Sequence, residues 1–185
     1  MNFIERVKNL LLAPKLEWQT ISGEKHTVQD IYAQYLVLLA GLPAAGHLLS
    51  FGRYGGFSGS LRVALVSYLA VLIGAYVTGL AVDHLAPNFS SNRSLVNAFK
   101  VVVYGITPIL VAGALAMLPG LGELAVLAGA VYSLYLLYLG LPVLMGTPEE
   151  KVVSYMIVAF MACMIVYFVL GSIFAVFFGV SFWRQ

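Results

Sequence analysis

The chain has 185 residues, of which 61% are hydrophobic and only 10% are charged, and its formal net charge is +2. A soluble domain carries about 25% charged residues, and one of this length could not bury so much apolar surface, so the composition indicates a membrane protein. The small charge, without basic clusters, excludes a nucleic-acid partner. A single cysteine, Cys163, excludes a disulfide framework and CxxC chemistry.

The first 30 residues predict an amphipathic segment on the cytoplasmic surface of the membrane. Its apolar helical face contains Phe3, Val7, Leu10 and Leu11, and its polar face contains Glu5, Arg6, Lys8 and Asn9. This division is typical of a helix that lies in the membrane interface. Pro14 ends the helix, and we expect Pro14 and Trp18 to hold the following turn at headgroup depth.

Five stretches are long and apolar enough to cross a hydrocarbon core of about 30 Å as helices. They cover residues 31–50, 61–82, 101–118, 124–144 and 152–180. Charged residues lie at the edges of these stretches and not in their interiors. We therefore predict an all-α polytopic membrane protein, with segment 1–30 followed by one five-span domain over residues 31–185.

The positions of Lys and Arg predict the orientation of this domain. With the N-terminus in the cytoplasm, seven of the ten Lys and Arg residues lie on the cytoplasmic side and three lie outside. Because cytoplasmic loops carry the excess of positive charge, the N-terminus is predicted inside and the C-terminus outside. Trp183 is then expected to anchor the outer end of the last span.

The three histidines invite a metal site, but the topology separates them. His47 lies near the outer end of the first span, whereas His26 and His84 lie on the inner side. His26, Asp83 and His84 could together hold an ion there, and the alternative is an interfacial polar cluster that ends the second span. No GxSxG, HExxH or paired-carboxylate motif is present, so we expect neither a cofactor nor an enzymatic activity.

Prolines lie within or near three spans, at Pro43, Pro108 and Pro142. Each removes a backbone hydrogen bond, which can create a hinge or a cavity lined by unpaired carbonyl groups. The alternative is that proline and glycine are simply frequent in membrane helices. The third span places a glycine and two hydroxyls beside its proline, in the group Tyr104, Gly105, Thr107 and Pro108.

A tyrosine stripe runs along the fourth span at Tyr132, Tyr135 and Tyr138. These hydroxyls could line a polar path or bind a lipid headgroup. Alternatively, the stripe is a packing seam whose hydroxyls bond the carbonyl groups of neighbouring helices.

The last span carries a ladder of small residues at Gly171, Ala175 and Gly179. This spacing lets two helix backbones approach closely. The ladder could seat a neighbouring span of the same chain, or it could form the face of a homo-oligomer.

Three short sequence elements, spread over most of the chain, bear on the family to which it is related. They are Leu11-Leu12-Ala13-Pro14 followed by Trp18 and Ile21, then Tyr104-Gly105 followed by Pro108, and finally Tyr138-Leu139-Gly140-Leu141-Pro142 through Met145, Thr147-Pro148 and Lys151. Their order and spacing resemble the bacterial branch of the Ypt-interacting protein (Yip) family, whose members have five spans and a cytoplasmic N-terminus.

This resemblance implies a non-enzymatic, multi-pass protein of the bacterial inner membrane that acts as a scaffold, organiser or trafficking-type adaptor. Eukaryotic relatives are associated with Rab-type GTPases, but the Asp-Leu-Tyr-Gly-Pro element of those members is absent from this sequence. The expected partners are membrane lipids, a second copy of the chain and a protein at the cytoplasmic face. The alternative function is a passive channel or small transporter for a neutral or lipid-like substrate, with its path near the third and fourth spans.

Overall fold

The computed structural model describes residues 2–50 and 52–178, and the regular elements in these ranges are all helices. Five helical segments are long and apolar enough to cross a membrane, which confirms the predicted fold class. They run over Val28–Leu48, Phe57–Phe89, Leu95–Met117, Leu121–Met145 and Glu149–Phe174. Each begins a few residues before its predicted start, because polar residues such as Asp30 and Lys100 are already helical.

The first span consists of α3 (Val28–Ile31), a π-helical turn η1 (Tyr32–Leu36) and α4 (Val37–Leu48). Thr27 begins it with a capping box, in which the Asp30 amide donates to Thr27 Oγ1 and the Thr27 amide donates to Asp30 Oδ2. The wide π turn, a feature often found at functional sites, contains the buried Tyr35.

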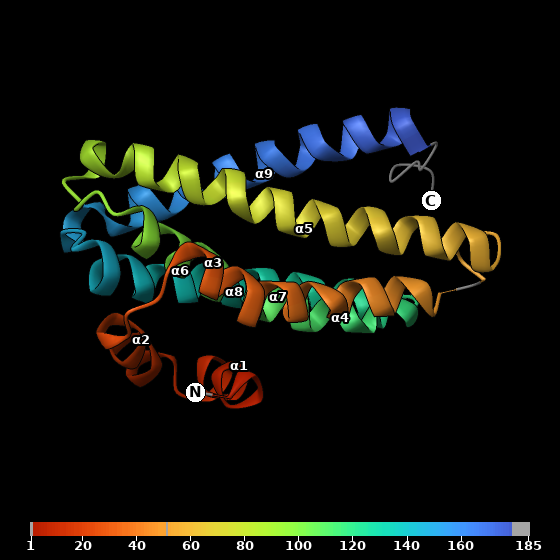
Figure 1. The fold of residues 1–185 in the computed structure, drawn as a ribbon, viewed down its shortest axis with the longest axis horizontal. Helices are drawn as coiled ribbons and strands as arrows, with labels where there is room; N and C mark the ends of the chain where they lie inside the picture. Colours follow the sequence, from red (N-terminus) through yellow and green to blue (C-terminus); the bar gives the residue numbers. More distant parts are fainter. Residues whose placement is uncertain (1, 51, 179–185) are drawn as a thin grey trace.

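The second and fifth spans form one layer of the bundle (Figure 1). They are α5 (Phe57–Leu85), extended by the 3₁₀ turn η2 (Ala86–Phe89), and α9 (Glu149–Phe178). The hydroxyl of Tyr155 donates to the Val82 carbonyl at 2.5 Å, and the ring of Tyr155 stacks on Phe89 with centroids 4.6 Å apart. These contacts join the two helices near the connections 86–94 and 146–148. That end is called the inner end below, because the sequence predicts that it faces the cytoplasm.

The third span is interrupted at Ile106, between α6 (Leu95–Gly105) and α7 (Thr107–Gly113), and it ends in the 3₁₀ turn η3 (Ala114–Met117). The interruption lies at the predicted kink, where Pro108 has no amide hydrogen to continue the helical ladder.

The fourth span, α8 (Leu121–Met145), follows a tight turn with Gly120 at a φ of 78°. It returns antiparallel to α7, and the two helices approach closely at Gly129. A Cβ atom at Gly129 would lie 2.8 Å from the carbonyl oxygen of Pro108. Together with α4, these helices form the second layer of the bundle (Figure 1).

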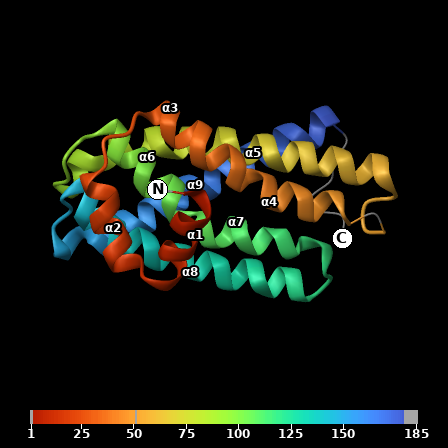
Figure 2. The same ribbon diagram turned by 60° about the horizontal axis from the view of Figure 1, so that its bottom comes forward.

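Two short helices precede the spans, α1 (Phe3–Leu12) and α2 (Pro14–Gly23). Asn2 caps the first of them, and Pro14 begins the second at a position where a missing amide hydrogen does no harm. Figure 2 shows this helix pair on one flank of the bundle, in front of α7 and α8.

Candidate functional site

The helix pair α1–α2 is docked onto the bundle through buried residues of both helices. Leu10, Trp18 and Ile21 are fully buried and belong to the main hydrophobic core, together with residues of α6 and α8. The hydroxyl of Tyr132 donates to the Leu11 carbonyl at 2.9 Å. Because Tyr132 lies halfway along α8, α1 extends from the inner end of the bundle towards its middle.

A network of charged side chains holds the pair in place. Arg6 Nη1 donates to Glu17 Oε1 at 2.6 Å, and Arg6 Nη2 donates to Glu24 Oε1 at 2.5 Å and to Oε2 at 2.6 Å. Asn9 donates to the second oxygen of Glu17 at 3.1 Å. Both Arg6 and Glu17 are buried, so each charge is matched by a partner inside the protein.

Lys100 of α6 completes this network from the side of the bundle. Its side chain is buried, and its ammonium group donates to the carbonyl oxygens of Ile21 at 2.9 Å and of Glu24 at 2.6 Å. These carbonyls lie at the C-terminal end of α2, where the helix dipole favours a positive charge. The third span therefore holds the C-terminal end of α2 in place.

The carboxylate of Glu24 titrates below its ordinary range. Its partial burial acts to raise the pKa, but the hydrogen bonds and the positive charge of Arg6 outweigh this effect, and the pKa is lowered. His26 adds a further contact, with its Nε2 3.2 Å from Glu24 Oε2. Glu24 thus acts as a charged link between α1 and the start of the first span.

Aromatic rings lie beneath the charged network. The guanidinium carbon of Arg6 is 5.4 Å from the centre of the Tyr104 ring, and the rings of Tyr104 and Tyr35 are 4.8 Å apart. The hydroxyl of Tyr35 is 2.8 Å from Thr107 Oγ1. The π turn of the first span and the interruption of the third span are joined at this hydrogen bond.

Trp18 lies inside the protein and has no surface open to lipid headgroups. Its ring is fully buried against α8, and a Cβ atom added at Gly140 would lie 2.8 Å from Trp18 Cζ2. The ring also meets Tyr104 edge to face. Pro14 is likewise buried. The docking of α2 covers both residues, whereas the sequence suggested contact with lipid headgroups.

The residues predicted to form a path near the third and fourth spans point to different surroundings. Tyr104 and Thr107 face the helix pair and the first span, whereas Tyr135 and Tyr138 are exposed on the outside of α8. Tyr132 bonds a neighbouring carbonyl, as the packing-seam interpretation expects.

The other predicted hinge residues are Gly105, Pro108 and Pro142. Gly105 packs against a neighbouring helix, and the two prolines lie near helix ends. A Cβ atom at Gly105 would meet Leu137 of α8 at 2.7 Å. Pro108 and Pro142 lie at the start of α7 and near the end of α8.

The three candidate metal ligands are not brought together. Among the described residues, no three His, Cys, Asp or Glu side chains form a group that could hold a metal ion. Asp83 pairs with Arg93 at 3.0 Å and His26 contacts Glu24, while His84 is exposed. This corrects the metal hypothesis for His26, Asp83 and His84.

The small-residue ladder of the last span is described only in part. A Cβ atom at Gly171 would meet nothing within 4 Å, so no neighbouring span of the described chain is seated there. Gly179 and Trp183 lie outside the described residues, and the side chain of Ala175 does as well.

The residues of the network were not identified as a site from the sequence. The sequence predicts Arg6 on the polar face of an amphipathic helix and Lys100 at the edge of an apolar stretch. The capping pattern of Asn2 and the apolar spacing of α1 predict the helix, but a helix wheel carries no information about the partner of its polar face. The sequence signal for the network is a pair of glutamates, Glu17 and Glu24, which follow Pro14 by about one and three helical turns.

The fold and the docked pair define a polytopic α-helical membrane protein whose N-terminal helices are locked onto one flank of a five-span bundle. The Yip1 domain pattern matches residues 8–180, and the chain belongs to this family. It is 29% identical over 167 residues to the inner membrane protein YohC of Escherichia coli K12, covering 82% of this chain and 85% of the relative. The protein of the same name in E. coli O6:H1 matches to the same extent. No solved structure matches the chain significantly.

Proposed function

We propose that this protein is a non-enzymatic organiser of the bacterial inner membrane, and that the helix pair α1–α2 acts as a wedge in the cytoplasmic leaflet. The location is supported by the five spans, by the distribution of Lys and Arg, and by the name of the E. coli relatives. A wedge widens one half of a membrane protein and so favours a curved bilayer around it.

The observation that carries the proposal is a set of large apolar side chains that the docked pair leaves exposed, two of which, Ile4 and Leu12, line an open apolar groove beside the bundle. Ile4 is 69% exposed, Leu12 is 74% exposed and Leu16 is 68% exposed. Amphipathic helices with such side chains insert them into the boundary between headgroups and acyl chains. The pair lies on one flank of the bundle and nearer its inner end (Figures 1 and 2). In our proposal, its added cross-section therefore falls on one leaflet.

The buried network supports the same proposal because it makes the wedge rigid. A free amphipathic helix can leave the membrane or change its depth. Here Arg6 ties α1 to α2 and Lys100 ties α2 to the third span, so the depth of Ile4 and Leu12 is set by the spans.

The test is reconstitution into vesicles of phosphatidylethanolamine and phosphatidylglycerol, with vesicle diameter measured by electron cryomicroscopy. We expect the diameter to decrease as the protein-to-lipid ratio rises. The triple variant Ile4→Ser, Leu12→Ser and Leu16→Ser should abolish this effect without unfolding, since the three side chains are exposed.

A matched control replaces three exposed polar residues of the same helices, as Glu5→Ser, Lys15→Ser and Gln19→Ser. The control should remodel vesicles like the unmodified protein. If the apolar triple variant also remodels them to the same extent, the wedge proposal is wrong.

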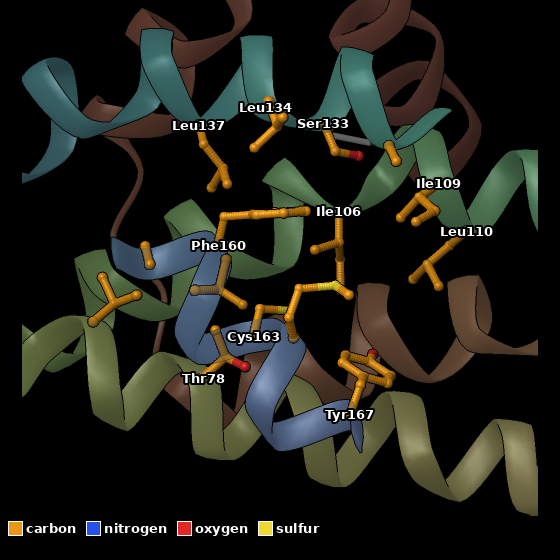
Figure 3. A pocket seen from close by; sticks show the side chains of 15 residues that line it. Thr78, Ile106, Ile109, Leu110, Ser133, Leu134, Leu137, Phe160, Cys163 and Tyr167 are labelled. Atoms are coloured by element: carbon orange, nitrogen blue, oxygen red, sulfur yellow. The ribbon is translucent and has the colours of Figure 1, made fainter. Parts of the chain in front are cut away.

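A passive path for a neutral solute is the second candidate function, and the observation that favours it is an apolar cavity inside the bundle (Figure 3). Tyr104, Thr107 and Tyr135 do not line this cavity. A vesicle flux assay tests the path directly: flux abolished by Ala130→Phe, which fills the cavity, would favour a channel.

The family resemblance also predicts a homo-oligomer and a protein partner at the cytoplasmic face, and both stay predictions.

A further inference from the structure

A cavity of about 200 Å³ lies between α5, α6, α7, α8 and α9, beside the interruption of the third span (Figure 3). Its walls are mainly aliphatic and aromatic, and include Val102, Ile106, Leu134, Leu137 and Phe160. An apolar cavity of roughly 150 Å³ in another protein stays dry and binds benzene. This cavity is therefore large enough for an apolar group of similar or greater size.

Three side chains with hydroxyl groups interrupt the apolar lining, and they are Ser133, Thr78 and Tyr167. Ser133 of α8 is only 7% exposed, and its Oγ has no hydrogen-bond partner among the described residues. Thr78 of α5 faces it across the cavity, with the weakly hydrogen-bonding thiol of Cys163 beside it (Figure 3). A buried hydroxyl without a partner is costly, so Ser133 points to a ligand that supplies one.

The position and charge of the lining restrict what that ligand can be. The lining residues include no charged side chain, so a charged or zwitterionic headgroup would be left without a partner. Ser133 lies halfway along α8, far from the ends where headgroups lie. The fitting ligand is a neutral molecule with an apolar body and one small polar group.

We propose that this cavity binds the hydroxyl-bearing end of a neutral long-chain alcohol, with that hydroxyl group paired to Ser133. An alcohol both donates and accepts a hydrogen bond, as a serine hydroxyl does, whereas a hydrocarbon does neither. No residue of α1 or α2 lines the cavity, so this site is independent of the wedge.

The experiment uses the full chain in phosphatidylethanolamine–phosphatidylglycerol vesicles, with a hexadecanol that carries a photoreactive diazirine in its chain. Cross-linked peptides are mapped by mass spectrometry. We expect labelling of the segments 130–137 and 159–167, and we expect unlabelled hexadecanol to compete with it far better than hexadecane does.

Two variants of α8 form a matched pair. Ala130 lines the cavity, so Ala130→Phe fills it and should remove most of the labelling. Ala128 is exposed on the same helix, so Ala128→Phe should leave the labelling unchanged.

Ser133→Ala keeps the space and removes the hydroxyl. We expect it to lower the preference for hexadecanol over hexadecane roughly two- to tenfold, which is the range of one net hydrogen bond. This variant tests the site even if Ala130→Phe does not fold. Labelling that persists in Ala130→Phe, equal competition by hexadecane, or an unchanged preference in Ser133→Ala would each overturn the proposal.

Discussion

Arg6 is the side chain on which the docking of the helix pair depends. Its guanidinium group reaches both Glu17, eleven residues later, and Glu24, eighteen residues later. A buried arginine can keep its charge only if carboxylates take up its donors, and the planar guanidinium suits this double contact. The network therefore specifies one arrangement of α1 against α2.

Replacing Arg6 is expected to undock the pair. Arg6→Met leaves the buried carboxylate of Glu17 without its cation, and such a loss costs about 3–5 kcal/mol. The amides of residues 3–23 should then exchange their hydrogens at least about a hundredfold faster, because the docked state is less populated. Hydrogen exchange followed by mass spectrometry in detergent measures this directly.

The control for this prediction is Lys8→Met on the exposed side of the same helix, which should leave exchange unchanged. The double variant Arg6→Met with Glu17→Met should recover part of the protection, because it leaves one fewer uncompensated charge. Unchanged exchange in Arg6→Met would show that apolar contacts alone hold the pair.

Glu24 gives the docking a dependence on acid pH. Its pKa is lowered from the ordinary value of about 4.3, so its contribution to stability is complete above that pH and is lost as the pH falls through the lower folded-state pKa. Below about pH 4, acrylamide should therefore quench the fluorescence of Trp18 more strongly. The measurement needs the Trp183→Phe variant, since the chain has two tryptophans.

Glu24→Gln is the control for the acid effect. It cannot titrate, so its quenching should be higher at neutral pH and should change less between pH 5 and pH 3. An acid response of the same size in Glu24→Gln would assign the effect to another carboxylate.

At the scale of elements, the first and third spans meet at glycines. A Cβ atom at Gly46 of α4 would lie 2.6 Å from the carbonyl oxygen of Gly113, and one at Gly113 would lie 2.7 Å from Pro43 Cβ. The contact at Gly46 is made by backbone atoms, which cannot move aside as a flexible side chain can.

Gly46→Ala should therefore lower the stability of the bundle by about 1–3 kcal/mol, the usual cost of overpacking. Gly41→Ala on the same helix meets nothing within 4 Å and should be neutral or stabilising, because alanine is the better helix former. Thermal unfolding of the two variants in detergent compares them. A destabilisation of equal size at both positions would contradict the close approach.

The spans could be predicted from the sequence because a bilayer imposes a simple rule on length and polarity. The interruption at Ile106 could also be predicted, since Pro108 removes a backbone donor. The π turn over Tyr32–Leu36 could not, because a register shift in a helix depends on packing and leaves no regular pattern in the residues.

The candidate site was harder to predict because its contacts join distant residues. Lys100 bonds carbonyl groups 76 and 79 residues earlier, and a backbone carbonyl has no signature in a sequence. A lysine at the edge of an apolar stretch gives the same sequence pattern whether its side chain faces water or bonds the end of a buried helix. The role of Ser133 could not be predicted either, because the sequence does not show whether a serine within a span has a hydrogen-bond partner.

At the scale of the whole molecule, the orientation of the bundle decides which leaflet receives the helix pair. The prediction is tested with single cysteines in a Cys163→Ala background and a membrane-impermeant maleimide on intact cells. Gly52→Cys lies at the outer end and should be labelled, whereas Asn88→Cys lies at the inner end and should be labelled only after permeabilisation. The reverse pattern would place the N-terminus outside and overturn the cytoplasmic wedge.

The docking of the helix pair also has a consequence for biosynthesis. α1 and α2 leave the ribosome before the spans that they contact, and these contacts include Lys100 of the third span and Tyr132 and Gly140 of the fourth. During translation, the pair therefore stays undocked until the fourth span has been inserted, and Arg6 and its carboxylates stay hydrated until then. In a chain that stops after the third span, α1 and α2 would stay undocked and open to protease. Protection of α1 and α2 from protease would therefore indicate that the fourth span has been inserted.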